Sequence, residues 1–143
     1  MLKEVRHRGY CMGSLPNGID LLEGFTTLCE KENITLGRLE AIGAVQRACF
    51  GFFNQQSREY QFTEKNETME ILKCSGNISL SNGKPMVHAH IILADEHGTA
   101  YGGHLAKGTI VFACEFIIQA FDTTVALKRE FDATTGLRLW KEE

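Results

Sequence analysis

Only one stretch of this chain has the spacing of an amphipathic helix, and almost everything after it reads as β-strand. The apolar residues of that stretch recur at i, i+3/i+4 and i+7. They are Leu21, Leu22, Phe25, Leu28 and Cys29. Asn17 is placed to cap the start of this helix, and Asn33 suits its end. One helix beside many strands joined by short turns predicts an α+β fold with a largely antiparallel sheet.

The expected strands are segments rich in β-branched and aromatic residues, separated by residues typical of turns. Residues 5–15, ahead of the helix, look extended. After the helix we expect strands at 38–45, 48–53, 59–62, 68–80, 87–94, 100–104, 110–121 and 125–131. No linker, repeat or low-complexity segment divides the chain, so we expect residues 1–143 to form a single domain with one core.

Charge and cysteine usage argue against several functional classes. The formal net charge is −3, whereas a free-standing nucleic-acid binder usually has a basic excess. The five cysteines contain no Cys-x-x-Cys pair, which argues against a disulfide framework or a cysteine-based zinc site. No apolar run approaches the roughly 20 residues of a membrane span, and the first residues lack the apolar core of a signal peptide. We therefore expect a cytoplasmic protein that does not bind membranes.

Four of the five histidines lie between residues 88 and 104. His88 and His90 are two apart on an expected strand, so their side chains share a face. A three-residue connection over residues 96–98 would put Gly98 in the left-handed position that such a loop prefers. This loop places His104 directly opposite His90. A two-residue loop would instead shift the register by one and turn His104 to the other face.

Three converging imidazoles suit a first-row metal ion. Zinc binds neutral imidazole nitrogens, and three protein ligands leave a fourth position for water or a ligand. Gly102 and Gly103 remove side chains beside this patch, which lets either a ligand or another backbone approach closely. The competing interpretation is that the histidines are solvated surface residues or hydrogen-bonded core residues. Because three of them are expected on one patch, we favour a site for a metal or an anionic ligand.

Glu115 is a second candidate, because it lies within the apolar strand expected at 110–121. A carboxylate in such a setting is costly unless it is paired. It could orient a histidine, act as a catalytic acid or base, or bond to a neighbouring subunit. An ordinary salt bridge is an equally good explanation. No nucleophile triad, phosphate loop or dinucleotide fingerprint is present, so the sequence leaves open whether the protein is an enzyme.

The combined pattern resembles the Plants and Prokaryotes Conserved (PPC) domain. The matching segments are residues 72–80, 85–90, 95–98 and 102–105, with 18–22 and 41–45 upstream. The resemblance implies a curved, mainly antiparallel sheet with one main helix packed against it, assembled as a homotrimer. It also implies that His88, His90 and His104 form a metal site, with zinc as the expected ion.

Three functional hypotheses follow. The first is a metal-binding homotrimer whose three-histidine site takes a small ligand. The second, which the label of the PPC family implies, is a DNA-binding or chromatin-associated protein. The Arg-Gly-Arg-Pro hook of the plant members is absent, since Arg6-His7-Arg8-Gly9 lacks the proline. The third is a purely structural assembly module whose histidines pack between subunits.

Overall fold

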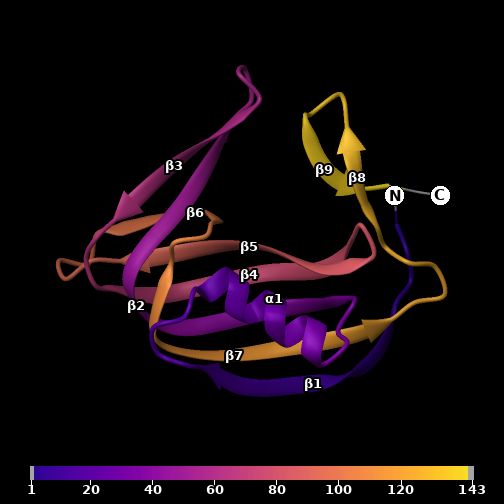
Figure 1. Ribbon diagram of the computed structural model, residues 1–143, viewed down its shortest axis with the longest axis horizontal. Coiled ribbons are helices and arrows are strands. Elements are labelled where there is room, and N and C mark those ends of the chain that lie inside the picture. The colour runs from indigo at the N-terminus through magenta and orange to yellow at the C-terminus, as the bar shows by residue number, and fades with distance from the viewer. Residues whose placement is uncertain (1, 142–143) are drawn as a thin grey trace.

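The computed structural model describes residues 2–141 and contains one large antiparallel sheet, one helix and a small separate hairpin (Figure 1). The elements are β1 (Arg6–Leu15), α1 (Leu21–Lys31), β2 (Gly37–Asn54), β3 (Glu59–Lys65), β4 (Met69–Ser81), β5 (Lys84–Ala94), β6 (Ala100–Leu105), β7 (Ile110–Asp122), β8 (Arg129–Asp132) and β9 (Leu137–Trp140). The large sheet has the order β1-β7-β2-β4-β5-β6, and β3 pairs with β2. The strands β8 and β9 pair with each other in a second, two-stranded sheet.

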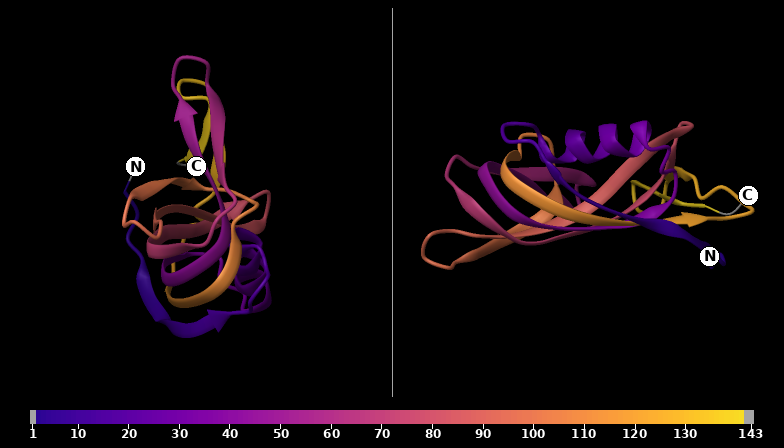
Figure 2. Two further views of the ribbon diagram at one scale, coloured as in Figure 1. Left: turned by 90° about the vertical axis from the view of Figure 1, so that its left-hand side faces the viewer. Right: turned by 90° about the horizontal axis from the view of Figure 1, so that it is seen from below.

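The helix packs on one face of the curved sheet (Figure 2). Leu21, Phe25 and Cys29 are fully buried, and the ring of Phe25 meets that of Phe116 edge-on, with centroids 5.7 Å apart. The helical stripe expected from the sequence is therefore confirmed. The α+β label fits only loosely, because the chain is mostly antiparallel sheet with one helix of 11 residues. Within residues 2–141, no helix is long and apolar enough to span a bilayer.

The strands expected at 38–45 and 48–53 are one continuous strand, β2, of 18 residues. Its register against β7 shifts on either side of Val45. Such bulges bend a strand and increase its local twist. The second half of β2 therefore turns away from β7 and β4, and it pairs instead with β3 and, through Gly51 and His104, with β6.

The C-terminal part of the chain differs from the expectation. The strand expected at 125–131 begins only at Arg129, and its partner β9 was not expected. In Figure 1 the β8–β9 hairpin and the arm formed by β2 and β3 rise from the same side of the sheet. The two touch where Arg58 Nη1 donates to the carbonyl of Ala133 at 3.1 Å.

The helix is capped by Asp20 rather than by Asn17. Asp20 Oδ1 accepts from the backbone N–H of Glu23 at 3.0 Å, and its Oδ2 accepts from that of Gly108 at 2.6 Å. The side chain of Asn17 instead donates to the carbonyl of Phe112. The cap therefore lies three residues later than expected, where its second oxygen also holds the loop before β7.

Replacing Asp20 by alanine should lower the free energy of unfolding by about 2 kcal/mol, because both a helix cap and a loop contact are lost. Urea denaturation, monitored by circular dichroism, measures this free energy of unfolding. Glu30→Ala, on the exposed side of the same helix, is the control and should change stability by less than about 0.5 kcal/mol. Equal stability of the two variants would contradict the capping role.

Candidate metal centre

The turn between β5 and β6 has the geometry predicted from the sequence. Gly98 adopts a φ of +77°, and the backbone N–H of Asp95 donates to the carbonyl of Thr99 at 3.1 Å. Asp95 Oδ1 accepts from the N–H groups of His97 and Thr99 at 3.0 and 2.9 Å. This turn sets the register that brings His90 opposite His104.

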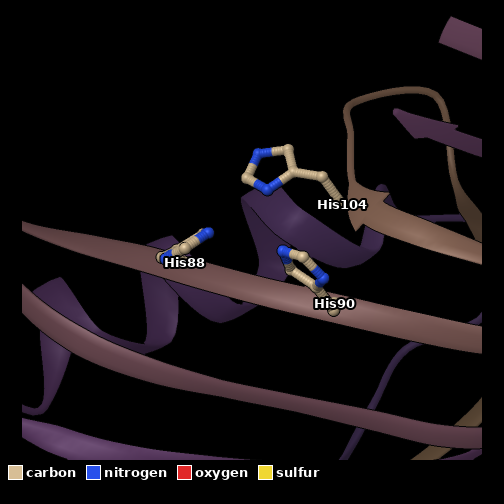
Figure 3. Close-up of side chains that lie close together, drawn as sticks. All are labelled: His88, His90 and His104. Atoms are coloured by element: carbon tan, nitrogen blue, oxygen red, sulfur yellow. The ribbon is translucent and has the colours of Figure 1, made fainter. Parts of the chain in front are cut away.

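The three predicted ligands converge. His88 and His90 lie on β5 and His104 lies on β6, and each ring directs a nitrogen towards the other two rings (Figure 3). Their centroids are 5.0 to 5.6 Å apart. One ligand nitrogen from each ring lies within 4.8 Å of those of the other two. The predicted juxtaposition of the three histidines is confirmed.

Burial keeps two of the rings neutral. It is the main reason why the pKa of His88 is lowered to about 4, and the positive charge of Arg129 contributes next. Burial also lowers the pKa of His104, followed by the effects of His90 and Arg129. A neutral imidazole keeps the lone pair that binds a metal ion. These two side chains are thus in the protonation state of metal ligands at neutral pH.

One ring nitrogen has no partner. Among the described residues, Nδ1 of His104 is the only buried side-chain nitrogen or oxygen without a hydrogen bond. Leaving such a group unsatisfied costs about 1–3 kcal/mol, and a metal ion bound among the three rings would relieve part of this cost. The donor set of three imidazoles and this unsatisfied nitrogen both fit a resident first-row metal ion.

Two residues that lie beside the histidines could not be predicted from local sequence patterns. The ring of Tyr60, on β3, lies 4.9 Å from that of His104. Arg129, on β8, has Nη2 3.2 Å from Nδ1 of His88. Both come from the arm and the hairpin that rise from the sheet. Only the long-range folding of these segments brings them to the site.

Gly102 and Gly103 are needed where backbones approach closely. A Cβ on Gly102 would lie 2.4 Å from the carbonyl oxygen of Ile91, and one on Gly103 would lie 2.5 Å from that of Gly51. This explains both glycines by the approach of another backbone, one of the two alternatives that the sequence left open. Their role in a ligand pocket stays a prediction.

The structure does not bring Glu115 to the histidines. It lies on β7, paired with Ser14 and Ile42, and β2 and β4 separate β7 from β5. Its side chain is exposed and lines a groove of about 770 Å³ with apolar neighbours from β1, β2 and β4. Contact with a neighbouring subunit, one of the roles left open for this carboxylate, stays a prediction.

Comparison with known proteins identifies the family. Residues 4–122 match the Plants and Prokaryotes Conserved domain, abbreviated PCC or PPC. The chain belongs to this family. A metal-containing protein from Archaeoglobus fulgidus has the same fold as this PCC chain, with a TM-score of 0.94 and 37% sequence identity over 99% of each chain.

Two further relatives are described differently from the metal-containing protein. A structure from Bacteroides thetaiotaomicron, described as that of a candidate DNA-binding protein, has a TM-score of 0.85 and 26% identity, covering 97% of this chain and 96% of that one. The bifunctional protein GlmU of a Synechococcus strain is 28% identical over 130 residues, which are 90% of this chain. The PCC chain spans only 20% of that protein's length.

Proposed function

We propose that this PCC-domain protein binds zinc through His88, His90 and His104 and offers the remaining coordination position to a small ligand. The observation that carries this proposal is the convergence of three imidazoles from two strands, with Nδ1 of His104 buried and unsatisfied. The description of the Archaeoglobus fulgidus protein as metal-containing supports it. Zinc suits a site made of imidazoles alone, and when bound it would supply an electrophilic centre.

The protein's own residues have simple roles in this proposal. The β5–β6 turn holds His90 opposite His104, and Arg129 contacts the ring of His88 on the side of Nδ1. Tyr60 covers His104 from β3. Among the described residues, no carboxylate belongs to the cluster. The proposal is therefore a site that binds a ligand, without an assigned acid or base.

Elemental analysis of protein purified without a chelator and without a histidine tag tests the proposal. We expect about one zinc ion per chain, since three histidine ligands leave a stable site with one open position. Dialysis against a chelator should remove the ion, and added zinc should restore it. A protein that holds no metal after zinc is added would refute the proposal.

We propose further that the protein is a homotrimer that associates through the sheet face turned away from α1. Four large apolar side chains on this face are 41 to 76% exposed, and all four line the groove that contains Glu115. They are Met12, Ile42, Leu72 and Ile117. Contiguous exposed apolar surface of this kind is typical of interfaces between proteins.

A single charge on this face should prevent association. Ile42→Asp is expected to convert the trimer to a monomer at micromolar concentration, because a carboxylate would be buried without a partner. Light scattering coupled to size-exclusion chromatography measures the mass. Val125→Asp, at a residue that is 38% exposed outside the sheet, is the control and should remain trimeric. A wild-type monomer would refute the proposal.

The second candidate function is DNA binding, which is favoured by the description of the Bacteroides thetaiotaomicron relative. The net charge of −3 opposes it, although a trimer would repeat the basic residues Arg6 and Arg8. Titration with duplex DNA at low salt would show binding that weakens steeply as salt is added. Absence of binding at low salt would remove this candidate.

A further inference from the structure

A buried arginine lies against the histidine cluster. Arg129 is only 6% exposed. Its Nε donates to Ser79 Oγ at 3.0 Å, its Nη1 to the carbonyl of Arg138 at 3.0 Å, and its Nη2 to Asn77 Oδ1 at 2.7 Å. The same Nη2 lies 3.2 Å from Nδ1 of His88. Because a guanidinium can only donate, Nδ1 of His88 accepts this bond.

The charge of Arg129 is not compensated by any carboxylate within residues 2–141. Its hydrogen-bond partners are a hydroxyl, an amide, a carbonyl and an imidazole, and the cluster itself contains only histidines. A metal ion held by three neutral rings would keep its full positive charge beside this guanidinium. Buried charge of one sign is costly unless an opposite charge accompanies it.

We propose that the small ligand of this site is an oxyanion of the carboxylate or phosphate class, and that Arg129 sets this preference. The inference rests on the proposed metal site and specifies what occupies its open position. An anion there would balance both the metal ion and the guanidinium. A neutral ligand of the same size would leave both charges uncompensated.

Arg129 acts in this proposal as a positioning residue. Four of its five N–H groups are engaged, so the guanidinium is fixed in place and attracts the anion by its field. Arg129 lies on the β8–β9 hairpin, and its guanidinium carbon is 5.4 Å from the centroid of the Trp140 ring. Arg129 also lies beyond residues 4–122, where the family match ends. The segment that follows the family match thus supplies the charge that selects the ligand.

Calorimetric titration of the zinc-loaded protein tests the inference, with inorganic phosphate, acetate and neutral imidazole as probes. Arg129→Gln should weaken phosphate and acetate binding about tenfold, which is the scale expected for loss of one nearby charge. Imidazole binding should change by less than about threefold. Arg129→Lys keeps the charge and should retain most of the anion affinity. Lys84→Gln removes an exposed charge from the same strand as His88 and should have no effect.

The outcomes separate this inference from the proposed function. If the wild-type protein holds no zinc, the metal site itself is refuted. If zinc stays bound but Arg129→Gln weakens the binding of anions and of imidazole equally, the inference is overturned. It is also overturned if the substitution weakens the binding of neither. Arg129→Met provides the same loss of charge if the glutamine variant does not fold. Comparison of phosphate with acetate shows which class of oxyanion the site prefers.

Discussion

Replacing Gly43 by alanine should destabilise the fold by about 4 kcal/mol, a large effect for adding one methyl group. Gly43 has a φ of +145°, a conformation that residues with a side chain rarely adopt. A Cβ at this position would lie 2.1 Å from the carbonyl oxygen of Ala113 and 2.9 Å from Cα of Cys114. Both atoms belong to the backbone of β7, so no rotation of a side chain can relieve the overlap.

Gly9→Ala is the matched control for this substitution. Gly9 also lies in a strand, but a Cβ there would have no atom within 4 Å. We expect this variant to change stability by less than about 0.5 kcal/mol. The midpoint of urea denaturation, followed by circular dichroism, measures both variants. Two variants of equal stability would show that β2 and β7 can separate at Gly43, contrary to the close approach of their backbones.

The parts of the fold that could be predicted are those that rest on local periodicity. The helix follows from the spacing of Leu21, Phe25 and Cys29, and β5 and β6 follow from the turn that ends at Gly98. The cap and the bulges could not be located, because Asp20 is selected by a contact with Gly108, 88 residues away. The bends on either side of Val45 likewise depend on the register between β2 and β7.

The same distinction holds for the histidine site. The convergence of the three histidines was predictable because two lie on one strand and the third follows a short turn, so strand geometry and loop length fix their positions. Arg129 and Tyr60 come from segments that reach the site only after the chain has folded. Glu115 was a candidate because it is a carboxylate in an apolar strand. The alternation of side chains along β7 places it on the exposed face of the sheet. The sequence alone does not reveal that α1 packs on the opposite face of the sheet.

Replacing His104 by alanine should lower the zinc affinity at least about a hundredfold, since one of three protein ligands is lost. Zinc content after dialysis should then fall from about one ion per chain to less than about a tenth of that value. His97→Ala is the control, because His97 lies in the turn of the same hairpin with its side chain 79% exposed. That variant should keep its zinc.

The fold should survive the loss of His104, so the metal content of the variant can be interpreted. The ring of His104 is only half-buried, and its Nδ1 has no hydrogen bond to lose. Its removal also ends the contact with Tyr60, which we expect to cost about 1 kcal/mol. Full zinc content in a folded His104→Ala protein would show that the ion is held elsewhere. The unsatisfied nitrogen would then need another explanation.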